Sequence, residues 1–169
     1  MKKNLTLTGM MGVGKSTVGK ALSKKLLMQF SDVDNIIEEK IGMSIQGIFE
    51  KKGELFFRKI EEKITLEIVQ KKDTIISLGG GAFMNSNIRK NILSTSMSFW
   101  LDLDIKLLEK RLIKSKKRPL LNSVNLRETL EKLFKERKNI YASANCRINC
   151  DKLTSKLITN KIIKLYANN

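Results

Sequence analysis

A chain of 169 residues with 41% hydrophobic residues is long enough to fold as one compact domain with a buried core. Two cysteines and no histidine exclude a disulfide framework and the usual four-ligand zinc site. The apolar runs are far shorter than the ~20 residues that a membrane-spanning helix needs. We therefore expect a single domain over residues 1–169, located in the cytoplasm and without a membrane partner.

The basic residues outnumber the acidic ones by 33 to 17, which gives a net charge of +16. Lysine supplies 26 of the basic residues and arginine only seven. The lysines are scattered along helical stretches, which is typical of a solvated surface and not of a nucleic-acid-binding tract. We expect partners among small molecules and no nucleic acid.

Short apolar runs alternate with helical patterns along the whole chain. Strands are predicted near residues 4–8, 28–33, 75–78, 98–101 and 147–150. Helices are predicted near residues 15–27, 35–41, 45–52, 57–71, 104–112, 126–134 and 158–166. This alternation predicts the α/β class, with three αβα layers and about five parallel strands.

The strongest motif lies between the first strand and the first helix. The segment Gly9–Thr17 contains the pattern G-x-x-x-x-G-K-[ST] in full, and its position between a strand and a helix indicates a P-loop. Glycines let backbone N–H groups face a phosphate chain, Lys15 can reach the terminal phosphates, and the Ser16 hydroxyl can ligate Mg²⁺. A glycine turn with a surface lysine is the alternative, and the strand and helix around the motif argue against it.

Two carboxylates follow the second predicted strand, in the segment Asp32-Val33-Asp34. Ligands of parallel sheets bind at the carboxyl ends of the strands, and strand alternation predicts that Asp32 and Asp34 point to the same side. One carboxylate can then serve the metal, while the other orients or deprotonates an acceptor hydroxyl. Alternatively, Asp34 only caps a helix that begins near Asn35.

Glycine, proline and arginine mark the remaining candidate positions. The run Gly79–Gly81 follows a predicted strand, where bare backbone can approach a ligand closely. The single proline, Pro119, predicts a lid over about residues 114–125. Guanidinium groups bind carboxylate and phosphate through two parallel hydrogen bonds, so the few arginines are candidates for recognition. Ordinary salt bridges, such as Arg58 with Glu61 or Glu62, are the alternative for each of them.

Taken in order, these motifs resemble the signature of the shikimate kinase family, which is of the nucleoside-monophosphate-kinase type. The matching segments are Gly9–Thr17, Asp32–Asp34, Phe57-Arg58 with Glu61, Gly79–Gly81, Arg118–Leu121, and Glu136-Arg137 with Tyr141. The resemblance implies a monomer with a P-loop and a helical lid. It also implies transfer of the γ-phosphate of ATP to the 3-hydroxyl of shikimate, a step of the chorismate pathway toward aromatic amino acids.

The resemblance also implies roles for individual residues. The implied catalytic residues are Asp34, Lys15 and Arg118. The implied ATP-binding residues are Gly12, Val13, Gly14, Lys15, Ser16, Thr17, Arg111 and Arg118. The implied shikimate-binding residues are Asp34, Phe57, Arg58, Glu61, Gly79, Gly80, Gly81 and Arg137, with a substrate-binding helical region over about residues 34–62. Mg²⁺ would be held by Ser16 and Asp32.

Two other functions remain possible interpretations of the sequence. Another small P-loop kinase, for gluconate or a nucleoside monophosphate, would share the P-loop but gives no reason for Asp34, Arg58 and Arg137 together. A basic protein that binds nucleic acid under nucleotide control would need aromatic residues interleaved with basic ones. Aromatic residues make up only 6% of the chain, and most fall in core-like patterns.

Overall fold

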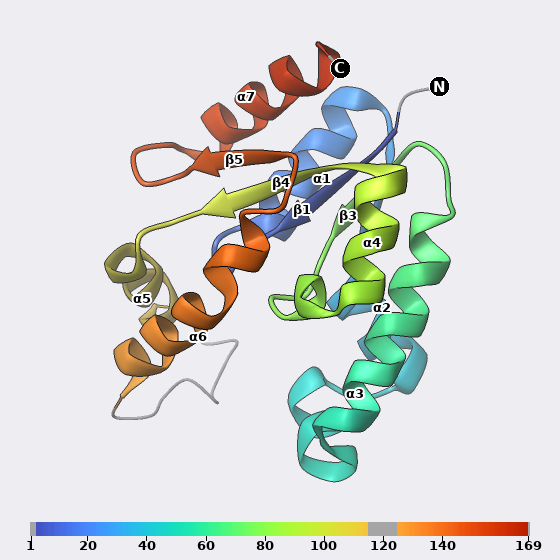
Figure 1. Ribbon diagram of the computed structural model, residues 1–169, viewed down its shortest axis with the longest axis vertical. Helices are drawn as coiled ribbons and strands as arrows, with labels where there is room; N and C mark the ends of the chain where they lie inside the picture. The colour runs from blue at the N-terminus through green and yellow to red at the C-terminus, as the bar shows by residue number, and fades with distance from the viewer. Residues whose placement is uncertain (1–2, 115–124, 169) are drawn as a thin grey trace.

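The computed structural model describes residues 3–114 and 125–168 (Figure 1). The described strands are β1 (Asn4–Thr8), β2 (Gln29–Asp32), β3 (Thr74–Ser77), β4 (Ser96–Asp102) and β5 (Cys146–Asn149). They form one sheet in the order β2-β3-β1-β4-β5, and every neighbouring pair is parallel. The predicted α/β class with five parallel strands is confirmed.

Helices cover both faces of this sheet. They are α1 (Lys15–Leu26), α2 (Val33–Ile41), α3 (Ile45–Val69), the 3-10 turn η1 (Ala82–Met84), α4 (Ser86–Thr95), α5 (Ile105–Ile113), α6 (Leu126–Tyr141) and α7 (Ser155–Ala167). The helices α1 and α7 pack together on one face, whereas α3 and α4 pack together on the other (Figure 1). The three predicted αβα layers are therefore present.

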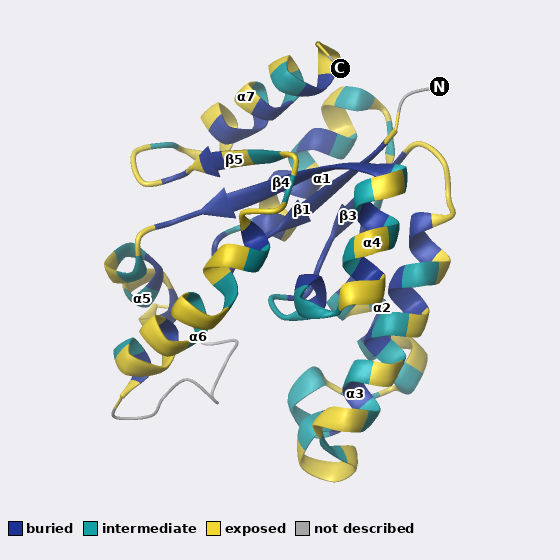
Figure 2. Cartoon of the chain, in the orientation of Figure 1, coloured by how far each residue is buried: buried dark blue, intermediate teal, exposed yellow. Residues whose placement is uncertain are grey.

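The burial of the strands shows that the sheet lies in the core. All residues of β1 and of β4 are buried (Figure 2). In β1 the residues Leu5 and Leu7 alternate with Asn4, Thr6 and Thr8, yet all five are buried, because helices cover both faces of the sheet. The sheet therefore holds the segments that leave its carboxyl edge in fixed positions.

Three features differ from the sequence prediction. The helix α4 was not predicted, although Asn85 caps it by accepting hydrogen bonds from the backbone N–H groups of Asn87 and Ile88. The predicted helices over 45–52 and 57–71 are one element, α3, broken at Gly53 by a non-helical φ of 79°. The strand β2 ends at Asp32, so Asp34 lies in the first turn of α2 and not on a strand.

The capping alternative for Asp34 is also corrected. The residue at the N-terminal cap of α2 is Asp32, whose side chain accepts a hydrogen bond from the Asn35 N–H at 3.4 Å. Asp34 is two residues further along, where an acid interacts favourably with the positive end of the helix dipole. The strand-alternation argument for these two carboxylates was therefore wrong, even though both side chains reach one cavity.

Residues 115–124 of the predicted lid, with Arg118 among them, lie outside the described residues. Over the described residues, no helix combines the length and apolarity needed to cross a membrane.

The turn that leaves β1 is held tightly against β4. Gly9 has a φ of 135°, and a Cβ atom on it would lie 2.4 Å from the backbone carbonyl oxygen of Leu101. Only glycine tolerates both the positive φ and this contact. The start of the P-loop is thereby fixed by the neighbouring strand.

Two alanine substitutions in the P-loop separate backbone strain from steric conflict. Gly14 also has a positive φ, 104°, but nothing lies within 4 Å of a Cβ there. Gly14→Ala should therefore lower the free energy of unfolding by about 1–2 kcal/mol, the cost of the backbone conformation alone. Gly9→Ala should lower it by about 3 kcal/mol or more, because the clash with the Leu101 carbonyl adds to the strain. Urea denaturation measures both values, and equal losses would contradict this explanation.

Candidate active site

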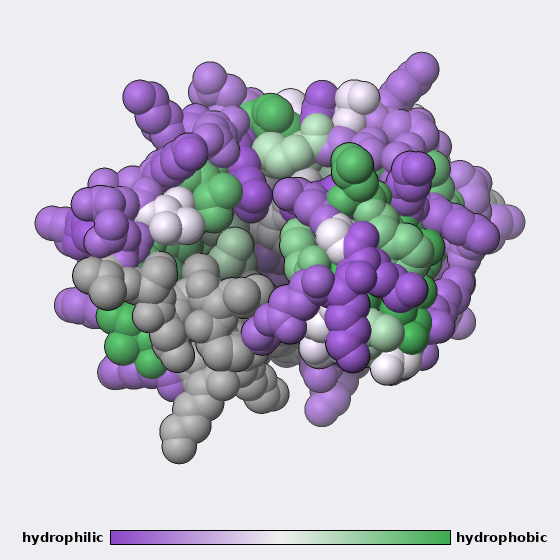
Figure 3. All heavy atoms as spheres, turned by 90° about the horizontal axis from the view of Figure 1, so that it is seen from below, coloured by the Kyte–Doolittle hydropathy of each residue, from purple (hydrophilic) through white to green (hydrophobic). Residues whose placement is uncertain are grey.

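A cavity of about 170 Å³ opens at the carboxyl ends of the strands. It is lined by Gly12, Gly14, Lys15, Ser16, Thr17, Asp32, Asp34, Ser77, Leu78 and Gly80. Figure 3 shows this end of the molecule, which is hollowed between the side that carries α3 and the side that carries α5 and α6. Residues predicted separately from the P-loop, the acidic segment and the glycine run thus meet in one cavity.

The P-loop wraps around the side chain of its own lysine. The Lys15 ammonium donates to the carbonyl oxygens of Gly9 at 2.8 Å and Met10 at 2.9 Å. Gly14 takes the cap position of α1 with a left-handed backbone, which leaves the first N–H groups of the helix facing the cavity. The arrangement combines a buried cation with a helix N-terminus, and both favour an anion.

Ser16 and Asp32 form an oxygen-rich corner beside the P-loop. The Ser16 hydroxyl donates to the Asp32 carboxylate at 2.5 Å, so the two predicted metal ligands are in direct contact. Hydroxyl and carboxylate oxygens suit Mg²⁺, which usually takes one or two protein ligands and fills its other positions with water and phosphate. Among the described residues, no group of three or more metal-binding side chains occurs. The corner therefore fits a magnesium ion that arrives with a nucleotide.

Two carboxylates approach each other at Gly79. A Cβ atom on Gly79 would lie 2.6 Å from Asp34 Oδ1 and 2.8 Å from Glu61 Oε1. Glu61 is only 1% exposed, and its Oε1 atom has no hydrogen-bond partner among the described residues. Burial raises the pKa of the Glu61 carboxyl, the Arg58 guanidinium opposes that rise, and the charge of Asp34 adds to it. Glu61 is thus held beside Asp34 at an energetic cost.

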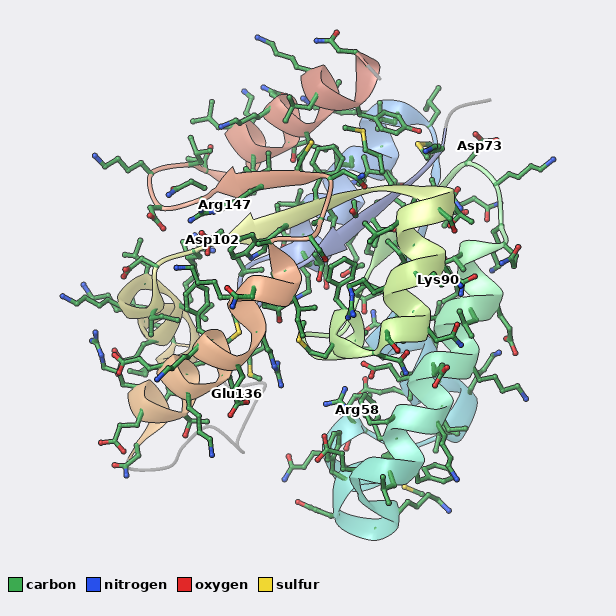
Figure 4. All side chains as sticks on the ribbon, viewed as in Figure 1. Arg58, Asp73, Lys90, Asp102, Glu136 and Arg147 are labelled. Atoms are coloured by element: carbon green, nitrogen blue, oxygen red, sulfur yellow. The ribbon has the colours of Figure 1, made fainter. Side chains whose placement is uncertain are left out.

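Two arginines flank the glycine run from opposite helices. Arg58 on α3 bonds Glu61 at 2.7 Å, and its guanidinium lies 2.7 Å from the position of a Cβ on Gly81. In Figure 4 its side chain projects from α3 toward the side of the molecule that carries α6. Arg137 on α6 donates to the carbonyl oxygen of Gly80 at 3.2 Å. The salt bridge expected of Arg58 is present, and the same guanidinium also borders the glycine run.

The other predicted site residues lie around this centre. Phe57 is 3% exposed and packs on the ring of Phe49, with a distance of 4.7 Å between ring centroids. Arg111 on α5 donates to the carbonyl oxygen of Val13 at 3.1 Å, which ties α5 to the P-loop. The Val13 side chain is buried, and Gly80 is the only member of the glycine run that lines the cavity.

Three residues of the site received no predicted role. Ser77 and Leu78 line the cavity where β3 ends, and the rule that ligands bind at strand carboxyl ends could have found them. Tyr141 donates a hydrogen bond to the Gly80 carbonyl oxygen across 61 positions of sequence. Sequence reasoning placed Tyr141 in a motif but offered no local signal for that contact.

Comparisons with known proteins cover almost the whole chain. A family model described as shikimate kinase matches residues 11–167. A protein named shikimate kinase from Sulfurihydrogenibium sp. (strain YO3AOP1) is 45% identical over 161 residues, which cover 95% of this chain and 96% of that protein. A shikimate kinase from Acinetobacter baumannii, solved in complex with shikimate, is 33% identical with a TM-score of 0.94, covering 100% of this chain and 95% of that one.

A kinase for a different acceptor shares the fold only. The structure of a gluconokinase from Sinorhizobium meliloti 1021 is 13% identical with a TM-score of 0.63, and the match covers 99% of this chain and 93% of that one. The similarity to a gluconate kinase is therefore confined to the architecture, whereas the similarity to shikimate kinases extends to the sequence.

The buried carboxyl of Glu61 predicts a pH-dependent stability. Because its pKa in the folded protein is raised from the ordinary value of 4.5, the folded state holds the proton to a higher pH than the unfolded state does. Stability from this group is then complete below pH 4.5 and is lost as the pH rises through the raised pKa. The Glu61→Gln variant lacks this loss. Its free energy of unfolding, relative to the original protein, should increase as the pH rises above 4.5 in urea titrations.

Glu61→Gln also removes the ion pair with Arg58, which forms only when Glu61 is ionised and which opposes the effect of burial on the Glu61 pKa. A difference between the two proteins that does not change with pH would contradict the raised pKa. A difference that decreases would mean that the Arg58 pair outweighs burial.

Proposed function

This chain belongs to the shikimate kinase family, and we propose on that premise that it transfers the γ-phosphate of ATP to the 3-hydroxyl of shikimate, giving shikimate 3-phosphate and ADP. The observation that carries the proposal is the convergence of Asp34, Arg58 and Arg137 on one glycine run beside the P-loop cavity. An acceptor with one carboxylate and neighbouring hydroxyls matches two arginines and an aspartate. A generic P-loop kinase does not require that combination.

The P-loop is the proposed nucleotide site. The N–H groups at the start of α1 and the Lys15 ammonium hold the phosphates, with Gly12 to Thr17 contributing the backbone. The ammonium must leave the carbonyl oxygens of Gly9 and Met10, to which it now donates, in order to bind phosphate oxygens. Its burial makes it a strong electrostatic partner, because a low dielectric strengthens charge interactions.

The ion that accompanies ATP is proposed to lie at the Ser16 and Asp32 corner. Mg²⁺, when bound, neutralises charge on the β- and γ-phosphate oxygens. Ser16 would offer its hydroxyl oxygen, and Asp32 would help through its carboxylate. The close contact of these two side chains supports their common role, and a single carboxylate suits an ion that also binds phosphates.

The acceptor is proposed to lie over the glycine run. Arg58 and Arg137 bind its carboxylate from two sides, and the Gly79–Gly81 backbone follows its ring. Asp34 binds the ring hydroxyls and takes the proton that the 3-hydroxyl releases as its oxygen attacks the γ-phosphorus. The bond between the γ-phosphorus and the bridging oxygen breaks, and ADP leaves. Phe57 and Glu61 hold Arg58 in place, because Phe57 lies 5.1 Å under its guanidinium and Glu61 is its ion-pair partner.

The remaining roles rest on the sequence. Arg118 in the lid would stabilise charge on the transferred phosphoryl group, and Arg111 would lie against adenine. A lid over about residues 114–125 would exclude water that otherwise hydrolyses ATP. We further propose one domain over residues 1–169 that acts as a monomer in the cytoplasm, with small molecules and not nucleic acid as its partners.

The proposed activity is tested by measuring ADP release with MgATP and one of three acceptors, namely shikimate, gluconate or AMP. Shikimate alone should stimulate ADP release, because only it presents a carboxylate together with vicinal ring hydroxyls. Stimulation by gluconate or AMP instead of shikimate would replace the proposed acceptor.

Asp34 is the residue whose loss should matter most for the acceptor. Asp34→Asn keeps a side chain of the same shape but removes the proton acceptor, so kcat/KM for shikimate should fall by ~10² or more. ATP binding should persist, because the P-loop is unchanged. The matched control is Glu39→Gln, an acid-to-amide change at an exposed position of the same helix, and it should leave both values unchanged. Near-normal shikimate phosphorylation by Asp34→Asn would remove this residue from the mechanism.

A further inference from the structure

Two side chains of α6 converge on one backbone carbonyl of the glycine run. The Tyr141 hydroxyl donates to the Gly80 oxygen at 2.5 Å, and the Arg137 guanidinium donates to the same oxygen at 3.2 Å. A carbonyl oxygen has two lone pairs and can accept both bonds. The proposed function assigns Arg137 to the substrate, whereas it gives Tyr141 no role.

The peptide that these donors hold lies between the two arginines. The carbonyl of Gly80 and the N–H of Gly81 belong to one planar unit, so fixing the oxygen fixes the N–H on the opposite side. Gly81 is the residue that Arg58 borders. Within residues 3–114 and 125–168, neither the Gly80 N–H nor the Gly81 N–H has an acceptor. The orientation of this peptide therefore sets the surface that a ligand meets between Arg58 and Arg137.

The two donors differ in what a bound carboxylate would do to them. A guanidinium binds a carboxylate more strongly than it binds a neutral carbonyl, so an anionic acceptor would draw Arg137 away from Gly80. The Tyr141 hydroxyl is neutral. Burial raises the pKa of the Tyr141 phenol, with the nearby Arg137 charge opposing this, and the hydroxyl keeps its proton as a donor. Tyr141 can therefore hold Gly80 when Arg137 is engaged elsewhere.

The ring of Tyr141 is buried by packing against neighbouring side chains. Its side chain is 0% exposed, and its ring stacks on Trp100 of β4, with 5.9 Å between centroids and 27° between planes. Its hydroxyl oxygen lies 3.9 Å from the sulfur of Met10 in the P-loop. This packing against Trp100 holds the phenol next to Gly80, so β4 sets its position.

We propose that Tyr141 is a positioning residue for the acceptor: its hydroxyl holds the Gly80–Gly81 peptide in place so that Arg137 can turn to the acceptor carboxylate. This inference rests on the proposed shikimate kinase activity. It assigns Tyr141 no contact with the reacting atoms. Without the hydroxyl, Arg137 must hold the Gly80 carbonyl and bind the carboxylate at the same time, and acceptor binding should weaken.

Two tyrosines, the only ones in the chain, provide a matched pair of variants. Tyr166 on α7 is also buried, and its hydroxyl donates to the Lys3 carbonyl oxygen at 2.5 Å, before the amino end of β1 and at the opposite edge of the sheet. Tyr141→Phe and Tyr166→Phe each remove one hydroxyl that donates to a backbone carbonyl. Both variants should lose similar stability in thermal unfolding, but only one changes the site.

The readout is the separate KM values for shikimate and ATP in the ADP-release assay. Tyr141→Phe should raise KM for shikimate about fivefold to tenfold, in keeping with the loss of one buried hydrogen bond, while KM for ATP changes less than about twofold. Tyr166→Phe should leave both KM values unchanged. A loss of general stability would not produce this split between the two substrates.

The possible results distinguish the role of Tyr141 from the proposed kinase activity. Absence of shikimate-dependent ADP release in the unaltered protein would overturn the proposed function, and the role of Tyr141 with it. An active unaltered protein whose KM for shikimate is the same in both variants would overturn the role of Tyr141 alone. Equal increases in both KM values for Tyr141→Phe would also overturn it, because they would indicate a general disturbance.

A binding measurement without turnover checks the kinetics independently. Trp100 is the only tryptophan in the chain and stacks directly on Tyr141, so its fluorescence should change when shikimate is titrated into the unaltered protein. Titration of the Tyr166→Phe variant should give the same dissociation constant, and titration of Tyr141→Phe should give one about fivefold to tenfold higher. Equal dissociation constants for all three proteins would contradict the proposal.

Discussion

The glycine run at residues 79–81 is the constraint on which the cavity depends. A Cβ atom at Gly79 would meet Asp34 and Glu61, and one at Gly81 would meet Arg58. At Gly80 it would lie 3.2 Å from the backbone nitrogen of Met11 in the P-loop. Side chains from α2 and α3 and the P-loop backbone therefore fill the volume that ordinary residues would occupy. The P-loop and the side chains of α2 and α3 thus pack closely against the bare backbone of this run.

Charge is distributed differently at this centre than over the surface. The chain carries a net charge of +16, yet the buried side of the glycine run holds the carboxylates of Asp34 and Glu61. Glu61 forms an ion pair with Arg58, and burial raises the pKa of its carboxyl. Holding the charged carboxylate at this position therefore costs free energy. This ion pair fixes the Arg58 guanidinium in one orientation. An arginine on the surface, without such a partner, would not be fixed in this way.

The parts of the site that were predicted from sequence are those with local signals. The P-loop is a contiguous motif, and the order of strands and helices follows from apolar periodicity. The prediction that Asp34 follows a strand was wrong because β2 ends at Asp32 and α2 begins at Val33, which places Asp34 in a helix. The helix α4 was missed although Asn85, Ile88 and Ile92 carry a cap and a buried face. The bond between Tyr141 and Gly80 joins elements that only the sheet brings together.

The spacing of Arg137 and Tyr141 brings both side chains to the glycine run. Residues four apart on a helix lie on one face, which is why both side chains reach the same carbonyl. Tyr141 ends α6 and is packed against β4 through Trp100, whereas Arg137 lies one turn closer to the amino end of α6. The Gly80 oxygen thus accepts one hydrogen bond from a buried neutral hydroxyl and one from a half-buried charged group.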